Sequence, residues 1–351
     1  MKPSIKLTTK RAKNLLLTLP ILAGLTLSSC TEADQSASGL AAFFPIKADT
    51  LVTFTVEGFD IPGTRTIYNT YVRGNRTQRM VLATDFPPSL EIVKVGADQV
   101  SLIFGDPHHY SVEDLTDVSP AQEIIILQAP VEVGTSWDKG GLPSAITSVD
   151  ALVETPLGTF TAVQVTTTLP DGSQERFYYA EGIGLIKSVH PNPLNTFTVT
   201  LYSIETDVPA AIPVAMLFPN ITDNVIIVEP RTLRLPTNAD FVPQLAQELS
   251  TAPNPDTLPL LPHADAINSI EIFRAQSLAH VDLNSSFREW NDLGDGTIGT
   301  VFMALTNTIG LFAEVNHVSY SIDGAPFTWG PIMLAEGEAV RVHDFSEITG
   351  Q

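Results

Sequence analysis

The hydrophobic pattern between residues 43 and 207 is that of short β-strands. Apolar side chains alternate with polar ones, or cluster as β-branched and aromatic residues, and turn residues such as those at 74–75 and 170–172 separate the runs. The runs lie at residues 51–56, 66–72, 78–83, 90–95, 100–104, 123–127, 145–154, 160–168, 175–179 and 196–202. Strands at this spacing predict an antiparallel sheet that curls into a half-barrel or a sandwich.

The pattern changes after residue 224. The predicted elements are, in order, a buried strand at 225–228, a helix at 238–250, strands at 269–273 and 279–283 that form a hairpin, a helix from residue 296, and a strand at 317–322. The last helix has the clearest period, because Val301, Leu305 and Ile309 share one face with further apolar residues. This β-α-β-β-α-β order predicts a small sheet with two helices over one face, so the chain as a whole is predicted to be α+β.

The N-terminal residues have the pattern of an export signal. Basic residues are followed by an apolar run from residue 15 to residue 27, which is shorter than the roughly 20 residues that a membrane-spanning helix needs. Leu27, Ser28, Ser29 and Cys30 then resemble the lipobox of bacterial lipoproteins. The resemblance implies a thioether-linked diacylglycerol on Cys30 and cleavage just before it. The alternative is an ordinary secretory signal, but Cys30 is the only cysteine of the chain.

Composition and motifs together divide the chain into segments. The expected segments are a lipoprotein signal peptide at 1–29, the lipidated cysteine and a flexible spacer at 30–42, the β-rich domain at 43–207, a Pro-rich linker at 208–224, a second domain at 225–332, and a C-terminal tail at 333–351. After residue 29 the chain has 14 Lys and Arg against 39 Asp and Glu, a net charge near −25. This charge repels nucleic acid and anionic headgroups, and we interpret it as a contribution to solubility.

Two further resemblances concern the predicted domains. Residues 133–137, 154–160 and 178–187 resemble, in this order, a β-meander domain of many bacterial surface lipoproteins, which implies a fold but no chemistry. Residues 222–332 resemble the GerMN domain of spore-germination and sporulation lipoproteins, through the stretches 281–287, 304–312, 315–318 and 321–324. That resemblance implies a module that packs against copies of itself or against partner proteins. The Pro-rich loop at 253–262 departs from the family pattern.

No set of residues forms a convincing catalytic or metal site. His108 and His109 beside Asp106 could bind a metal, but neighbouring residues of a strand point in opposite directions, so a surface loop is favoured. Residues 292–296 are similar to a calcium loop but lack its alternating acidic ligands and closing Glu, so a turn before the helix is favoured.

The remaining candidates are a hydrolytic group and an aromatic pair. His280 has Asp282, Ser285 and Ser286 nearby in the sequence, but nothing in their spacing requires them to converge, and Asp282 is interpreted as capping turn amides at the end of a strand. Phe327 and Trp329 follow Gly324 in a polar tail and could form an interaction surface. Folding back onto the sheet is the favoured alternative for these two side chains.

These observations predict a non-enzymatic envelope protein with no cofactor and no bound metal. It would be anchored to the cell membrane or outer membrane by the lipid on Cys30, with palmitate among its acyl chains, and would face away from the cytoplasm. Its C-terminal domain would contact an envelope protein or a second copy, with a sporulation or germination role implied by the GerMN resemblance. The alternative is a carrier or sensor that binds a small hydrophobic ligand in the β-rich domain. A wall-directed hydrolase that uses His280 is the third hypothesis.

Overall fold

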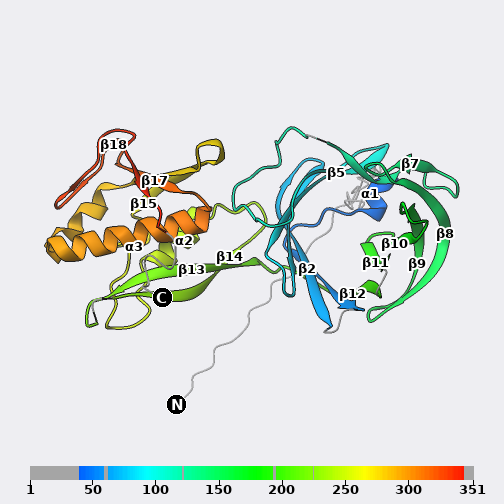
Figure 1. The fold of residues 1–351 in the computed structure, drawn as a ribbon, viewed down its shortest axis with the longest axis horizontal. Helices are drawn as coiled ribbons and strands as arrows, with labels where there is room; N and C mark the ends of the chain where they lie inside the picture. Colours follow the sequence, from blue (N-terminus) through cyan, green and yellow to red (C-terminus); the bar gives the residue numbers. More distant parts are fainter. Residues whose placement is uncertain (1–38, 59–61, 121, 193–194, 224, 344–351) are drawn as a thin grey trace, which may run out of the picture. The chain divides into compact units, whose positions relative to one another are not determined.

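The computed structural model describes residues 39–58, 62–120, 122–192, 195–223 and 225–343, and these belong to one compact unit. Cys30 and the predicted signal peptide therefore lie outside the described residues, as do residues 30–38 of the predicted spacer. Figure 1 shows the course of the chain. The fold is mostly antiparallel β-sheet, with a smaller region of helices and strands toward the C-terminus, which agrees with the predicted α+β class.

Twelve antiparallel strands form one large sheet in the order β6-β5-β4-β3-β2-β1-β12-β11-β10-β9-β8-β7. The strands are β1 (Thr50–Glu57), β2 (Gly63–Arg73), β3 (Arg76–Ala83), β4 (Ser89–Val95), β5 (Gln99–Asp106), β6 (Ile124–Gln128), β7 (Ser136–Asp138), β8 (Pro143–Thr155), β9 (Gly158–Thr168), β10 (Gln174–Ala180), β11 (Gly184–Pro191) and β12 (Thr196–Thr206). The two edge strands, β6 and β7, contact each other, so the sheet curls into a nearly closed barrel (Figure 1). Of the two arrangements predicted from the sequence, the curled sheet agrees with the structure, and a sandwich of two sheets does not.

A short helix, α1 (Leu40–Phe43), packs against the inner side of this sheet. Leu40 and Phe44 belong to the same core cluster as Val93, Trp137 and Val163. Leu40 is only 2% exposed, because an apolar side chain at this position is removed from water by the surrounding strands. The predicted flexible spacer at 30–42 is therefore wrong for residues 40–42, which are folded.

The predicted Pro-rich linker at 208–224 is also wrong. Residues 210–220 form β13 (Ala210–Asn220), which pairs along its whole length with β14 (Val225–Leu235) in a two-stranded sheet. Alternate side chains of β13 are buried, among them Ile212, Val214 and Met216. Each strand of a two-stranded sheet has only one neighbour, so proline can occupy the side that has no partner. The prolines of this segment therefore do not prevent a strand.

The smaller region is built on a second sheet. It contains β15 (Ile267–Phe273), β16 (Leu278–Leu283), β17 (His317–Ile322) and β18 (Ala325–Pro326) in that order, with β21 (Ala339–Arg341) also paired to β17. Strand β16 runs parallel to β17, and the connection between them contains the short helix η2 (Ser285–Leu293) and the long helix α3 (Asp295–Ala313). The predicted hairpin and closing strand are confirmed. The first predicted strand is not part of this sheet, since residues 225–228 belong to β14.

The helices of this region cover the apolar side of the second sheet. Val301, Leu305 and Ile309 of α3 are fully buried, as are Val281 and Val318 of the strands. Helix α3 is long and apolar enough to cross a membrane by length and composition, but most of its apolar stretch is buried in this core. Burying each large apolar side chain contributes about 1.5–3 kcal/mol before entropy is counted.

Helix α2 (Val242–Leu249) begins four residues later than predicted. Asn238 has a positive φ of 67° and therefore cannot begin a right-handed helix. A carboxylate oxygen of Asp240 accepts a hydrogen bond of 2.9 Å from the amide of Val242 and satisfies a donor of the first turn. Leu245 and Leu249 are fully buried, which confirms the predicted apolar face.

Candidate functional site

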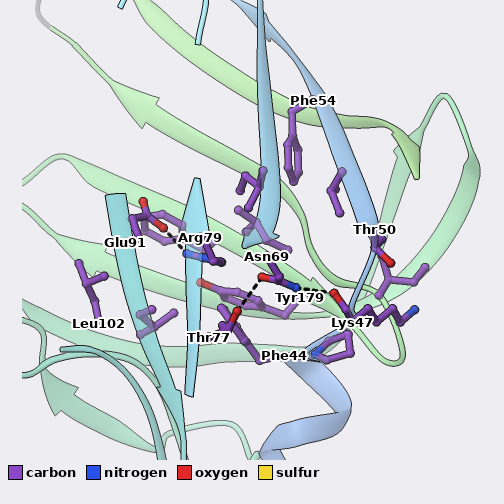
Figure 2. A pocket seen from close by; sticks show the side chains of 18 of the residues that line it. Phe44, Lys47, Thr50, Phe54, Asn69, Thr77, Arg79, Glu91, Leu102 and Tyr179 are labelled. Carbon is purple, nitrogen blue, oxygen red and sulfur yellow. Dashed lines mark hydrogen bonds and ion pairs between the residues drawn. The ribbon is translucent and has the colours of Figure 1, made fainter. Parts of the chain in front are cut away.

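A cavity with a volume of about 240 Å³ lies inside the twelve-stranded sheet. Successive side chains of a strand point to opposite faces, so alternate residues of β1 and β2 turn toward it. Figure 2 shows most of the side chains that line it. The apolar ones are Phe44, Pro45, Val52, Phe54, Ile67, Leu102, Ile124, Ile126, Phe177, Tyr179, Ile183, Leu185 and Ile204. The cavity is therefore mainly apolar.

The segment after α1 closes part of the wall. The amide of Gly182 donates a hydrogen bond of 2.7 Å to the carbonyl of Ala42, and the Lys47 ammonium donates one of 2.9 Å to the carbonyl of Gly182. Gly184 has a φ of 96°, and a Cβ there would lie 3.5 Å from Cδ of Pro45. These contacts hold residues 42–47 against the turn between β10 and β11.

A charged group of three residues forms one part of the wall. Arg79 on β3 and Glu91 on β4 are directly opposite in the strand pairing and form an ion pair. The guanidinium of Arg65 donates to the other carboxylate oxygen of Glu91 at 3.3 Å. The Arg79 guanidinium lies 5.2 Å from the centre of the Phe44 ring, which permits a cation–π contact. Figure 2 shows Arg79 and Glu91 together on one side of the cavity.

The electrostatics of this group follow from its burial. The side chains of Arg79 and Glu91 are 15% and 22% exposed. Burial alone raises the pKa of the Glu91 carboxyl, but the positive charges of Arg79 and Arg65 outweigh it, so the pKa lies below its usual value. Burial also lowers the pKa of the Arg65 guanidinium, and Glu91 opposes that shift. The group therefore remains a pair of cations that share one carboxylate.

A fourth charge comes from Lys139, just after β7. Its ammonium lies 3.7 Å from the centre of the Phe177 ring. Burial lowers the pKa of Lys139, and the nearby carboxylate of Glu175 opposes the shift. Glu175 itself is engaged elsewhere, because one of its carboxylate oxygens lies 2.8 Å from Nδ1 of His190. The Lys139 charge therefore faces the cavity beside an aromatic ring.

The histidines at 108 and 109 lie in an exposed loop after β5, as favoured from the sequence. Asp106 accepts hydrogen bonds from the amides of both residues, and Nδ1 of His109 lies 3.1 Å from the Glu314 carboxylate. Within the described ranges no group of three His, Cys, Asp or Glu residues is arranged to hold a metal ion. At residues 292–296 the backbone ends η2 and begins α3, where the carbonyl of Gly294 accepts from the amide of Ile298 at 3.0 Å.

His280 forms hydrogen bonds with two serines, but these are not Ser285 and Ser286, the serines considered from the sequence. Its Nδ1 lies 2.9 Å from Oγ of Ser319 and its Nε2 lies 3.0 Å from Oγ of Ser321. Ser321 in turn donates to the carboxylate of Asp282. The parallel pairing of β16 with β17 brings these four residues to one face, a contact that the sequence spacing did not reveal.

The predicted serines do not join this group. Ser286 donates to the side chain of Asn284. Ser321 stands between His280 and Asp282, whereas a nucleophilic serine donates its proton to the histidine. Asp282 also accepts from the amide of Gly324 at 2.9 Å, so it caps the turn as predicted. Burial raises the pKa of Asp282, but its hydrogen bonds, led by that from Ser321, bring the pKa below the usual value.

Phe327 and Trp329 are buried, with 0% and 1% exposure, and therefore do not form an interaction surface. Phe327 stacks on Phe302 with 5.3 Å between ring centres, and Trp329 packs edge-on against Phe287 at 4.8 Å. The apolar area of both rings draws the residues after β17 back onto the core. This is the fold-back alternative favoured from the sequence.

No family model matches the chain, and no curated protein matches it. Among solved structures, the putative lipoprotein of Parabacteroides distasonis is similar over 46% of this chain and 98% of its own, with 11% identity and a TM-score of 0.29. The tandem GerMN domains of the sporulation protein GerM from Bacillus subtilis are similar over 39% of this chain and 52% of their own, with 17% identity and a TM-score of 0.28. A chain of the Pseudomonas aeruginosa MucA/MucB complex is similar over 47% of this chain and 54% of its own, with 14% identity and a TM-score of 0.25. These similarities are of fold only, and at these values they carry no argument about function.

Proposed function

We propose that this protein binds a small, largely apolar ligand inside the twelve-stranded sheet. The observation that carries the proposal is the cavity of about 240 Å³ with its mainly apolar wall. For comparison, an engineered apolar cavity of about 150 Å³ in another protein binds benzene.

Binding of the neutral dye N-phenylnaphthylamine, followed by its fluorescence, tests this proposal on the purified full chain. Val52→Trp places a large side chain in the cavity wall and should weaken dye binding by about tenfold or more. Val133→Trp is the matched control, because Val133 is 63% exposed and lies outside the cavity wall. Dye binding that survives Val52→Trp unchanged would exclude the cavity as the binding site.

The proposed location is the outer side of a membrane, with the chain anchored through Cys30. The basic N-terminal residues, the short apolar run and the lipobox-like residues 27–30 support this part of the proposal. Cells fed a labelled fatty acid should incorporate it into the wild-type protein and not into Cys30→Ala. Equal labelling of both forms would rule out attachment at this residue.

A second candidate function is protein assembly through the C-terminal part. Strand β15 lies at an edge of the second sheet, and an edge strand offers unpaired backbone groups to a strand of another chain. A photo-reactive amino acid in place of Phe273, which is 39% exposed on β15, should crosslink an envelope protein or a second copy in intact cells. The same substitution at Tyr202, which is 53% exposed on β12, is the control. If the partner is a spore-envelope protein, a deletion strain should form or germinate spores abnormally.

A further inference from the structure

The charges that line the cavity differ from those of the chain. Of the 14 Lys and Arg residues after residue 29, four line the cavity: Lys47, Arg65, Arg79 and Lys139. Of the 39 Asp and Glu residues, Glu91 is the one that does so among the described residues. A strongly acidic protein therefore has a cavity wall with three more positive charges than negative ones. Solubility does not explain this excess, because charges that promote solubility lie on the outer surface.

The hydrogen bonds of the arginine pair leave donors available. Two guanidinium groups provide ten N–H donors, and the carboxylate of Glu91 is shared between them. Nε of Arg79 is buried and therefore out of reach of a ligand, so the available donors are among the other N–H groups of the pair, whose side chains are 30% exposed for Arg65 and 15% for Arg79. A carboxylate or phosphate group is the natural acceptor for such a fork, because it can bind two parallel N–H groups at once.

Lys139 adds a further positive charge, and its nearest carboxylate, that of Glu175, pairs with His190 and does not line the cavity. None of the described residues accepts a hydrogen bond from its ammonium, which instead lies over the Phe177 ring. Lys47 differs, because it donates to the carbonyl of Gly182. In a site with little water, interactions between opposite charges are stronger than at an exposed surface. The wall therefore favours an anionic group over a neutral or cationic one.

We propose that the ligand is an anionic amphiphile, whose carboxylate or phosphate head binds Arg65 and Arg79 and whose apolar part fills the rest of the cavity. This inference rests on the proposed ligand-binding function and names the class of ligand. The apolar part would contact residues such as Phe54, Ile67 and Leu185. The head would interact with the two arginines without displacing Glu91. The two guanidinium groups and the Glu91 carboxylate together carry one positive charge, which the head would balance.

Isothermal titration of the purified full chain with four probes tests the inference: octanoate, octanol, octyltrimethylammonium and acetate. Octanoate should bind about tenfold or more tightly than octanol, because a charge-assisted hydrogen bond is stronger than a neutral one. Octyltrimethylammonium should bind more weakly than octanol, and acetate should not bind measurably, since it has no apolar part. Arg79→Met should remove the preference for octanoate over octanol and leave octanol binding in place.

Arg231→Met is the matched control for Arg79→Met. Arg231 pairs with Glu248 at 2.8 Å, has a side chain 17% exposed, lies 5.5 Å from the Phe218 ring centre and has a buried Nε without a partner in the described structure. It resembles Arg79 in every one of these respects but does not line the cavity. Arg231→Met should therefore leave octanoate affinity unchanged. Glu91→Gln should increase the affinity for octanoate, because the variant removes the carboxylate that competes with the ligand head for the two guanidinium groups.

The outcomes separate the two proposals. Equal affinity for octanoate and octanol in the wild-type protein would overturn the anionic head and retain the apolar cavity, and this comparison requires no variant to fold. Acetate binding as tight as that of octanoate would show a plain anion site and overturn the amphiphile. Binding of none of the four probes would overturn the ligand-binding function itself.

Discussion

Gly310 lies in α3 at the point where Val342 of the C-terminal segment packs against the helix. A Cβ at Gly310 would lie 2.1 Å from one γ-carbon of Val342, closer than two carbon atoms can approach. At Gly299, in the same helix, no atom beyond the glycine's chain neighbours and the adjacent helix backbone lies within 4 Å of the position where a Cβ would be. The two glycines therefore separate the effect of packing from that of helix propensity.

We expect Gly310→Ala to lower the free energy of unfolding by about 1–3 kcal/mol, because the added methyl group forces Val342 away from the helix. Gly299→Ala should raise it by up to about 1 kcal/mol, since alanine favours the helical backbone. Urea unfolding of the two variants measures both values. An equal gain in stability from both substitutions would show that Val342 does not pack on α3.

Glu91 should make folding stability depend on pH in acid. Its pKa is lowered in the folded protein, so its ion pairs stabilise the fold fully above the unfolded value near 4.5, and that contribution is lost as pH falls through the folded value. Glu91→Gln should therefore be less stable than wild type at neutral pH, and the difference should shrink below about pH 4. Urea midpoints from pH 7 down to pH 3 test this. A difference that stays constant with pH would contradict it.

The residues of the cavity were not predicted from the sequence, although part of the signal was present. Thr77, Arg79 and Val81 alternate with residues of the opposite face, so a charged residue pointing inward was visible once the strand was assigned. What the sequence could not show is that Glu91 on the next strand lies directly opposite Arg79, because this depends on the register of the pairing. The Asp282 cap was predicted, since it depends only on a local turn.

Helix α1 illustrates how an element can be misjudged from composition alone. Its neighbours are small and polar, which is typical of a spacer, but Leu40 and Phe44 provide enough apolar surface to dock against the sheet. Strand β13 was misjudged for a related reason. Pro213 and Pro219 make this segment similar to a linker in composition, whereas the alternation of large and small side chains along it is the stronger signal. Helix α3 and strands β15, β16 and β17 agree with the prediction, because the regular spacing of their apolar residues determines which face is buried.

The docking of α1 predicts a stability effect that a flexible spacer would not give. Leu40→Ala should lower the free energy of unfolding by about 2–5 kcal/mol, as expected for a buried leucine. Leu152→Ala, at a leucine that is 76% exposed on β8, should change it by about 0.5 kcal/mol or less. Chemical denaturation of both variants gives the comparison. If Leu40→Ala is as stable as Leu152→Ala, α1 is not docked.

At the scale of the whole molecule, the fold depends on contacts between distant parts of the chain. Strand β1 pairs with β12, so that Thr50 lies opposite Thr206, and this pairing joins the two halves of the large sheet. Tyr68 and Met80 on the outer side of β2 and β3 belong to the same apolar core as β13, β14 and α2. We therefore expect the described residues to unfold together, so that a ligand bound in the cavity stabilises all of them.

Ligand binding in the cavity should stabilise the protein as a whole. A ligand that binds only the folded state adds about 2.7 kcal/mol at a concentration of 100 times its Kd. Octanol at that concentration should therefore raise the urea midpoint of wild type, and it should have much less effect on Val52→Trp, whose cavity is filled. A rise of equal size in both proteins would place octanol outside the cavity.

The meeting of β6 and β7 has a consequence for how a molecule reaches the interior. Each neighbouring pair of strands elsewhere in the large sheet is held by a ladder of paired residues, whereas in the described structure β6 and β7 are joined by one hydrogen bond of 3.0 Å, from the Trp137 indole to the carbonyl of Ile125. Ile124, Ile126 and Lys139 border the cavity along this same line. Parting the wall here would break that bond and separate Trp137 from the apolar side chains of β6, but it would leave every ladder intact, so this seam is where the barrel can open with its other strand pairs unchanged.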